Sequence, residues 1–324
     1  MPLLDGRDPR ALEAAADTIA AGRLVAFPTE TVYGLGARAD DDAAVARIFA
    51  AKGRPADHPL IVHVADLAAA ERFAAHFSAA ARRFADAFWP GPLTVIVPRR
   101  HGVAEAAAGG QDSIGLRLPS HPVALALLRA CAHRGVAGVA GPSANRFGRV
   151  SPTTAQHVVD EFGDALVVLD GGPCDVGIES AIVDCTRARP TLLRPGGLDR
   201  RRLEATLGDV LAAPDAASPR APGTLAAHYA PRARVRLLAP ADLARALAGG
   251  VPAGVAVYSR TVLPAPARAA FKAMPGDPAE VAHELFAVLR DFDAGGASAI
   301  WVEQPPPGPE WDGVRDRLVR AAAA

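Results

Sequence analysis

Two short runs near the N-terminus hold several side chains that could do chemistry together. The first, FPTETVYGLG at residues 27–36, combines hydroxyl groups with a carboxylate, at Thr29, Thr31, Tyr33 and Glu30. The second, KGRPADHPL at residues 52–60, brings three basic side chains within seven positions, at Lys52, Arg54 and His58. Polar groups just past a strand end, followed by fixed cations, suit an anionic small molecule. The two runs therefore predict a pocket for an anion.

Serine and arginine side chains recur later in the chain beside glycine–proline turns. The segment GPSANRFGRVS at residues 141–151 supplies two serines and an amide, at Ser143, Asn145 and Ser151. Arg194 directly precedes a proline–glycine turn, and Ser113 and Arg117 would share one sheet face if their stretch is a strand. Guanidinium groups bind carboxylate or phosphate through paired hydrogen bonds, and hydroxyls fill the remaining acceptor positions. Taken alone, each glycine–proline turn is better explained as a structural turn. Taken together, the serine and arginine side chains beside these turns predict further contacts to the anion.

Familiar motifs do not identify the ligand. The sequence has no GxxxxGK[ST], no GxGxxG after a strand, no HExxH and no GxSxG. His63 lies in an apolar stretch, where a histidine is more often a satisfied core residue than a ligand. The residues alone therefore predict an α/β enzyme that binds an anionic, phosphorylated ligand.

Composition narrows the class of protein. Half of the 324 residues are apolar, so a packed core is expected. The 35 basic residues balance 35 acidic ones, so stable binding to nucleic acid is not expected. The three cysteines form no CxxC pattern, which favours buried thiols in a reducing compartment. The N-terminal run MPLLDGRDPR lacks the pattern of a secretory signal, and no apolar stretch is long enough to span a membrane. We expect a soluble, cytoplasmic protein.

The elements that must position these residues can be read from apolar periodicity and capping residues. Strands are predicted at 24–27, 60–64, 93–97, 114–118, 136–140, 166–170, 180–184 and 191–194. Helices are predicted at 9–22, 43–51 and 122–135, the first capped by Asp8 and the second preceded by Asp40 and Asp41. Asp66 and Ser78 should cap two more. Because several strands follow one another directly, the sheet should be mixed rather than purely parallel.

The composition also predicts a division of the chain. A catalytic domain should span residues 1–208, and a proline-rich linker or lid containing HYAP should span 209–233. Residues 234–324 should form a smaller α/β domain with strands at 235–238, 255–258 and 299–303 and a helix at 279–291. A further helix should start at Trp311.

The motifs taken together resemble the YrdC family. PTETVYGLG, KGRPADHPLIVHV, WPGPLTVIV, GLRLPSHP, GPSANRFGRVSPT, CDVGIESAIVD and LLRPGG occur in the family's order. APGTLAAHYAP and a further domain follow, which is similar to the longer branch of that family, the L-threonylcarbamoyladenylate synthases. The resemblance implies a YrdC-like twisted mixed sheet with flanking helices, plus a smaller C-terminal Rossmann-like α/β domain.

The resemblance also implies an activity. Members of that branch condense L-threonine, bicarbonate and ATP to threonylcarbamoyl-AMP and pyrophosphate, and a downstream transferase machinery uses the product to modify tRNA. Positions that match threonine contacts are Thr31, His63, Arg117, Gly141 and Ser180. Positions that match ATP contacts, or lie beside them in the same motifs, are Lys52, Arg54, His58, Ser113, Ser143, Asn145, Ser151, Arg194 and the linker residue Tyr229.

The expected mechanism is positioning and electrostatics, in which Lys52, Arg54 and a Mg²⁺ ion that accompanies ATP neutralise charge on the phosphates. The ligands of that metal are not assigned. His58, Gly141 and Ala181 depart from the residues common in the family, as does the run before HYAP. Two alternatives stay open at this point: an RNA-binding YrdC-like module without synthase activity, and a carbamoyltransferase of the hydrogenase-maturation type. The latter should carry zinc-finger cysteines and an acylphosphatase module, neither of which the sequence shows.

Overall fold

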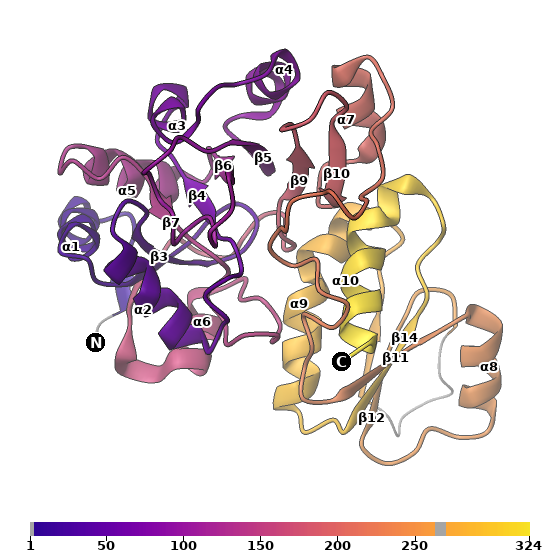
Figure 1. Cartoon of the computed structure of the whole chain (residues 1–324). Helices are drawn as coiled ribbons and strands as arrows, with labels where there is room; N and C mark the ends of the chain where they lie inside the picture. Colours follow the sequence, from indigo (N-terminus) through magenta and orange to yellow (C-terminus); the bar gives the residue numbers. More distant parts are fainter. Residues whose placement is uncertain (1–2, 263–269) are drawn as a thin grey trace.

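The computed structural model describes residues 3–262 and 270–324, which form a larger and a smaller α/β unit (Figure 1). The larger unit contains a ten-stranded sheet in the order β1-β8-β2-β3-β7-β4-β6-β5-β9-β10. Its strands are β1 (Leu3–Asp5), β2 (Val25–Phe27), β3 (Gly34–Arg38), β4 (Ile61–His63), β5 (Leu93–Pro98), β6 (Ser113–Arg117), β7 (Val139–Ala140), β8 (Val167–Asp170), β9 (Ala181–Asp184) and β10 (Thr191–Arg194). β4 runs parallel to β6 and β5 antiparallel to it, so the predicted mixed sheet is confirmed.

Helices cover both faces of this sheet because its strands are apolar on both sides. They are α1 (Pro9–Ala20), α2 (Asp42–Lys52), α3 (Leu67–Phe73), α4 (Ala79–Phe88), α5 (Pro122–Ala132), α6 (Ala155–Phe162) and α7 (Arg200–Leu207), with a 3₁₀ turn η1 (Gly163–Ala165). Val25 and Phe27 of β2 belong to the core with α1 and α5, whereas Ala26 belongs to the core that includes α2. The alternation follows from the two-residue period of a strand.

Local sequence chemistry sets where these helices begin and end. The predicted capping residues accept backbone N–H groups of the first turn, as confirmed for Asp8, Asp41, Asp66 and Ser78. α2 ends at Lys52, and Gly53 follows with φ +63°, a left-handed conformation that favours glycine. The chain turns there, so Arg54 leaves the helix in a new direction.

Several elements differ from the sequence-based prediction. The glycines at 34 and 36, which from the sequence could allow either a sharp turn or the close approach of a ligand, lie in strand β3. A Cβ at Gly36 would stand 2.9 Å from both the Phe27 ring and a Val139 methyl, so this glycine serves close packing inside the sheet. The strand expected at 136–140 is reduced to β7, and β1, α6 and α7 were not predicted.

The smaller unit is a parallel sheet with helices on both faces, which confirms the predicted Rossmann-like second fold. Its strands, in the order β11-β14-β12-β13, are β11 (Arg234–Leu238), β12 (Val255–Ser259), β13 (Ala270–Ala273) and β14 (Ala299–Glu303). Its helices are α8 (Pro240–Ala248), α9 (Pro278–Ala294) and α10 (Asp312–Ala322), with a 3₁₀ turn η2 (Pro309–Trp311). α9 and α10 lie between this sheet and the larger unit, and α8 lies on the outer side (Figure 1).

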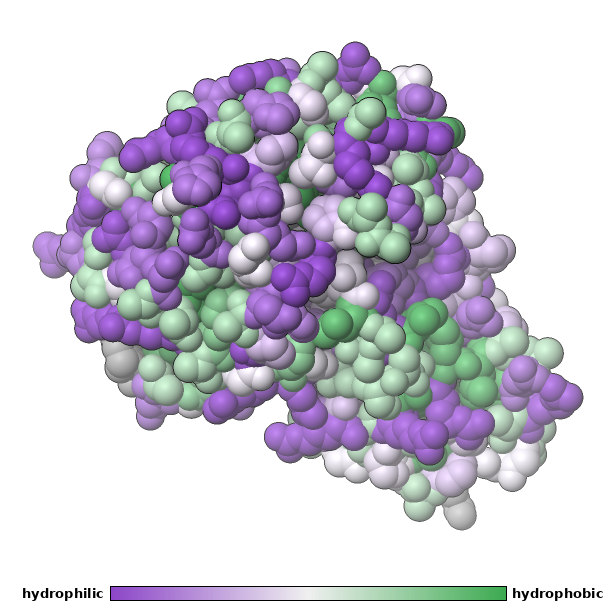
Figure 2. Space-filling view, in the orientation of Figure 1, coloured by the Kyte–Doolittle hydropathy of each residue, from purple (hydrophilic) through white to green (hydrophobic). Residues whose placement is uncertain are grey.

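The two units share apolar contacts. Val32, Val150 and Ile178 of the larger unit belong to the same buried cluster as residues of α9 and α10. Figure 2 shows strongly hydrophobic residues near the junction of the units, on a face where hydrophilic and hydrophobic residues are otherwise mixed. Residues 209–233, all of which the structure describes, form neither helix nor strand. The division at 1–208, 209–233 and 234–324 into independent domains stays a prediction. Within the described ranges, no helix is long and apolar enough to cross a membrane.

Candidate active site

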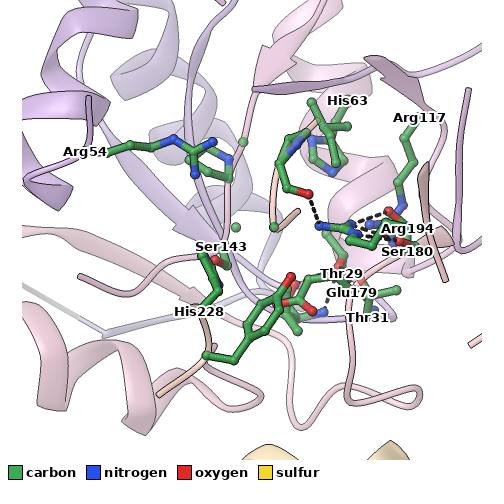
Figure 3. A pocket seen from close by; sticks show the side chains of 18 residues that line it. Thr29, Thr31, Arg54, His63, Arg117, Ser143, Glu179, Ser180, Arg194 and His228 are labelled. Carbon is green, nitrogen blue, oxygen red and sulfur yellow. Dashed lines mark hydrogen bonds between the residues drawn. The ribbon is translucent and has the colours of Figure 1, made fainter. Parts of the chain in front are cut away.

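A pocket lies where loops of the larger unit meet the segment 209–233 (Figure 3). Nine of the predicted site residues line it: Thr31, Arg54, His63, Arg117, Gly141, Ser143, Ser180, Arg194 and Tyr229. Five others do not line it: Lys52, His58, Ser113, Asn145 and Ser151. The structure therefore brings together residues that are almost 200 positions apart in the sequence, on the side of the sheet where β4, β6 and β10 end.

Hydroxyl groups in the pocket are held by their neighbours. The hydroxyl oxygens of Thr29 and Thr31 are 2.8 Å apart, and the Thr29 hydroxyl also donates to the carbonyl of Val32 at 2.7 Å. The Ser180 hydroxyl lies 2.8 Å from that of Thr94, which stands on the neighbouring strand β5. Their fixed positions allow these groups to orient a small polar ligand without a large loss of entropy.

Arg117 forms a buried ion pair with a carboxylate of the first run. Its Nη2 lies 2.7 Å from Oε1 of Glu30, and the two side chains are 4% and 6% exposed. The other Glu30 oxygen accepts the backbone N–H of Ser120 at 3.1 Å. Glu30 thus fixes the guanidinium at the pocket wall, and an incoming carboxylate would share Arg117 with it.

The imidazole of His63 is a neutral polar group in the same wall. Burial, reinforced by the positive charge of Arg117, lowers the pKa of His63 to about 3. Its Nδ1 is buried and has no hydrogen-bond partner among the residues that the structure describes. Its ring stands edge-on to Phe27, and a Cβ at Gly141 would lie only 3.1 Å from Nδ1. His63 therefore presents a free ring nitrogen to the pocket, which a satisfied core histidine would not do.

Two buried arginines supply positive charge to the rest of the pocket. Arg54 donates to the carbonyl of Pro59 at 2.9 Å. Arg194 donates to the carbonyl of Ser180 at 2.9 Å and 3.1 Å and to that of Pro222 at 2.9 Å. Burial lowers the pKa of Arg54 to about 10, so it remains a cation at neutral pH. Both guanidiniums are held by neutral carbonyls here, which leaves their charge available to an anion.

Lys52 and Asn145 hold the loop at 141–149 rather than facing the pocket. The Lys52 ammonium donates to the carbonyls of Ser143 and Asn145. The Asn145 amide donates to the carbonyls of Arg146 at 2.7 Å and Arg149 at 2.9 Å. Burial lowers the pKa of Lys52 well below its ordinary value. Both side chains fix the loop that carries Ser143, and direct contact of either with ATP stays a prediction.

Three further predicted residues lie near the pocket without lining it: Ser151, His58 and Ser113. The Ser151 hydroxyl donates to the carboxylate of Glu179, and the His58 ring packs 5.5 Å from that of Phe147. Ser113 lines a small neighbouring cavity that shares Ile61 and Pro222 with the main pocket. Contact of these three residues with ATP stays a prediction.

The linker forms the remaining wall of the pocket, at Pro222, Gly223, His228 and Tyr229. Tyr229 adopts φ +62°, unusual for a residue with a side chain, and its ring packs 5.6 Å from that of Phe286 on α9. With the linker in this position the cavity measures ≈ 40 Å³, room for about three water molecules. The linker residues thus narrow the cavity on this side.

Sequence reasoning missed three residues of this site. Glu179 and His228 line the pocket, and Arg317 of α10 lies 2.7 Å from Glu179. Glu179 had a signal, because it is a charged residue directly before Ser180 in an otherwise apolar run. His228 also had one, because it lies in the HYAP motif directly before Tyr229. Arg317 had none, since its helix reads as an ordinary amphipathic segment.

The fold and this site define the class: an α/β protein of the YrdC type with a cationic ligand pocket. The family model described as "Telomere recombination" matches residues 17–196, and the model "Threonylcarbamoyl-AMP synthase, C-terminal domain" matches residues 198–323. The chain belongs to the threonylcarbamoyl-AMP synthase family.

Relatives and solved structures agree with this assignment. The chain is 44% identical to a threonylcarbamoyl-AMP synthase of Pyrococcus abyssi, over 68% of this chain and 66% of that protein. It is 35% identical to that of Bacillus subtilis, over 98% of this chain and 94% of the relative. The crystal structure of P. abyssi Sua5 complexed with L-threonine is similar with a TM-score of 0.88 at 36% identity, covering 97% of this chain and 95% of that one. A P. abyssi Sua5 variant in which a neighbouring His and Tyr are replaced by Ala has a TM-score of 0.89 at 35% identity, covering 99% and 96%. The non-enzymatic RNA-binding alternative is not favoured by these relatives.

Proposed function

We propose that this chain condenses L-threonine and bicarbonate to a carbamate with loss of water, and then joins the carbamate to AMP. In the second step a carbamate oxygen attacks the α-phosphorus of ATP, the bond to the β-phosphate oxygen breaks, and pyrophosphate leaves. The product is threonylcarbamoyl-AMP. We further propose that a downstream transferase in the cytoplasm passes the threonylcarbamoyl group to tRNA.

The observation that carries this proposal is the convergence of buried polar groups on one pocket. The guanidiniums of Arg54, Arg117 and Arg194 all line it, so it suits a ligand with several negative charges. Buried atoms without a protein partner among the described residues also lie in its wall: Nε of Arg54, Nδ1 of His63, Nδ1 of His228 and Oη of Tyr229. Buried polar atoms are normally hydrogen-bonded, so these atoms are best explained as ligand contacts.

The arrangement divides the pocket into two ends. His63 and Arg117 lie on the side of Thr31 and Ser180, and Arg54 and Ser143 lie on the opposite side (Figure 3). We assign the first end to threonine, with Arg117 toward its carboxylate and Thr31, His63, Gly141 and Ser180 around its other polar groups. We assign the second end to ATP, with Arg54 and Ser143 toward the phosphates, Arg194 between the two ends, and Tyr229 covering the nucleotide.

The chemistry needs positioning and charge stabilisation rather than a covalent enzyme intermediate. Fixed guanidiniums in a site with little water stabilise charge that moves toward the leaving pyrophosphate. Because His63 is neutral, it can orient the hydroxyl or amine of threonine without adding charge. The closed linker would keep water from the mixed anhydride, which hydrolyses readily.

Mg²⁺ would enter as part of the ATP substrate. Glu179, which lines the pocket, pairs with Arg317, and Glu30 pairs with Arg117 of the pocket wall. Mg²⁺ prefers phosphate oxygens and retained waters, which the substrate itself brings. The ion would neutralise phosphate charge alongside Arg54.

Replacing Arg54 tests the proposed function. Arg54→Ala should lower threonine-dependent pyrophosphate release by about 10²–10³-fold, the usual cost of removing one preorganised charge-stabilising group. Arg47→Ala is the matched control, because Arg47 lies on α2 and donates to the carbonyl of Gly22 outside the pocket. Near-normal activity in Arg54→Ala would sink the site assignment. Pyrophosphate release by the unaltered chain that does not depend on threonine and bicarbonate would sink the function.

A further inference from the structure

Arg317, in the last helix of the chain, reaches the carboxylate that lines the pocket. Its Nε lies 2.7 Å from Oε2 of Glu179, and its Nη2 donates to the carbonyl of the same residue at 3.2 Å. Its Nη1 donates to the carbonyl of Pro195 at 2.9 Å. The Arg317 side chain is 0% exposed, although α10 belongs to the smaller unit. A guanidinium fork held in this way fixes both the position and the charge of its partner.

Glu179 needs such a partner because of where it lies. It is a pocket residue directly before Ser180, and its Oε1 accepts the hydroxyl of Ser151. Burial opposes its ionisation, but Arg317, Arg194 and the Ser151 hydroxyl together hold the pKa of Glu179 below its ordinary value. A carboxylate that stays charged in a pocket for phosphates would repel them unless a cation compensates it.

The same guanidinium also supports the linker. The Arg317 Cζ lies 5.1 Å from the centre of the Tyr229 ring, within the range of a cation–π contact. Tyr229 packs on its other sides against Phe286 and His228. Arg317 of the smaller unit therefore contacts two residues that line the pocket, Glu179 and Tyr229.

We propose that Arg317 is a positioning residue of the synthase site, which neutralises Glu179 so that the pocket accepts ATP and which holds Tyr229 over it. This inference rests on the proposed function. It gives the smaller unit a role in catalysis through one buried side chain, at a position that carries no motif.

A charge-removal and rescue experiment tests it. Arg317→Met keeps the length of the side chain and removes its charge, so the KM for ATP should rise about tenfold or more, with a smaller change in kcat. Arg317 also pairs with Asp316 at 2.8 Å, but Asp316 keeps a second partner in Arg320 at 2.9 Å. The double variant Arg317→Met with Glu179→Gln should therefore recover most of this loss, because the pocket no longer contains an uncompensated carboxylate. The control is Arg315→Met on the same helix, since Arg315 donates its hydrogen bonds to Pro306, Gly308 and Asp312 of the smaller unit. Its KM for ATP should match that of the unaltered chain.

Unchanged KM for ATP in Arg317→Met would overturn the proposal, as would a folded double variant no better than the single one. A purely structural role would also permit rescue, because Glu179→Gln removes the buried charge that Arg317 leaves behind; it predicts that the free energy of unfolding falls and recovers together with kcat. The proposal instead predicts that the KM for ATP rises and recovers in chains that stay folded. If Arg317→Met does not fold, Arg317→Lys carries the test: it keeps the charge that compensates Glu179, so its KM for ATP should stay within about threefold of that of the unaltered chain. A rise of about tenfold or more in a folded Arg317→Lys variant would count against the proposal. If the unaltered chain itself lacks threonine-dependent activity, the proposed function has failed, and calorimetric titration with ATP still reports whether Arg317 supports nucleotide binding.

Discussion

The two buried histidines of the pocket make the folded chain sensitive to acid. His63 and His228 are 3% and 6% exposed, and burial lowers the pKa of each to about 3. In the unfolded chain a histidine titrates near pH 6.5, as a rough reference value. Between these two values the unfolded chain binds protons that the folded chain does not, so acid favours unfolding.

We therefore predict that the free energy of unfolding falls as the pH drops from about 6.5 toward about 3, by up to about 1.4 kcal/mol per pH unit for each of the two histidines. Urea unfolding at a series of pH values measures the slope. His63→Gln should make it shallower, and His101→Gln, at an exposed position, should not. Equal slopes in all three chains would show that His63 is protonated in the folded state.

At the scale of residues, the sequence identifies candidate charged residues, but it does not predict the direction of their side chains. Lys52 and Arg54 are two positions apart and share one predicted role, yet Arg54 faces the pocket and Lys52 binds backbone carbonyls. The difference arises because α2 ends at Lys52, and Gly53 reverses the chain before Arg54. Side-chain direction at a helix end depends on this turn, which residue type and spacing do not specify.

At the scale of elements, α9 docks on the larger unit through Arg290. This side chain donates to the carbonyls of Val150 and Ser151 and to the carboxylate of Glu161 at 2.9 Å. The ion pair is largely buried, with side chains 14% and 11% exposed. The contact links the smaller unit to the loop that ends in Ser151.

Removing this contact should destabilise the whole chain. Arg290→Ala leaves Glu161 and two carbonyls without their donor, and we expect a loss of about 3 kcal/mol in the free energy of unfolding. Arg245→Ala, which removes an exposed ion pair with Asp242 on α8, should cost less than about 1 kcal/mol. Urea denaturation of both variants measures the difference. Similar small losses would mean that the apolar contacts alone hold the two units together.

Element type and order were largely predictable, because capping residues and apolar runs act locally. Helices after Asp8, Asp41, Asp66 and Ser78 begin where their caps predict. β3 was not predicted, because two glycines two positions apart favour a turn or a ligand contact over a strand. In the structure Phe27 and Val139 fill the space beside Gly36. Contacts of that kind join distant parts of the chain, and local sequence patterns do not reveal them. The role of Arg317 was missed for the same reason.

At the scale of the whole molecule, the linker is anchored along its length, and its middle lines the pocket. Arg187 binds Asp215 at 2.9 Å, Arg220 binds Asp57 at 3.0 Å, and Ala230 donates to the carbonyl of Gly148 at 2.9 Å. Between these points Gly223 packs against Tyr229. In the middle of the segment, Arg194 donates to the carbonyl of Pro222 at 2.9 Å, and the N–H of His228 donates to the carbonyl of Arg320 at 3.2 Å. Movement of the segment away from the pocket would break these contacts.

Gly223 should decide whether the linker closes fully. It adopts φ +71°, and a Cβ there would meet the Tyr229 hydroxyl at 2.1 Å and Nη1 of Arg194 at 2.9 Å. Gly223→Ala should therefore displace Tyr229 and admit water, so that less threonylcarbamoyl-AMP survives per pyrophosphate released. Rapid-quench measurement of both products gives this ratio.

Gly135→Ala is the control for the Gly223 experiment, because Gly135 has φ +77° and a Cβ there would have none of the described atoms within 4 Å. Both variants carry the same left-handed strain, about 1–2 kcal/mol of stability, but only Gly223→Ala also obstructs the linker. Closure of the linker, rather than general stability, then explains any difference in the product ratio between them. An identical ratio in both variants would mean that the pocket protects the mixed anhydride without help from the linker, and that Tyr229 serves binding alone.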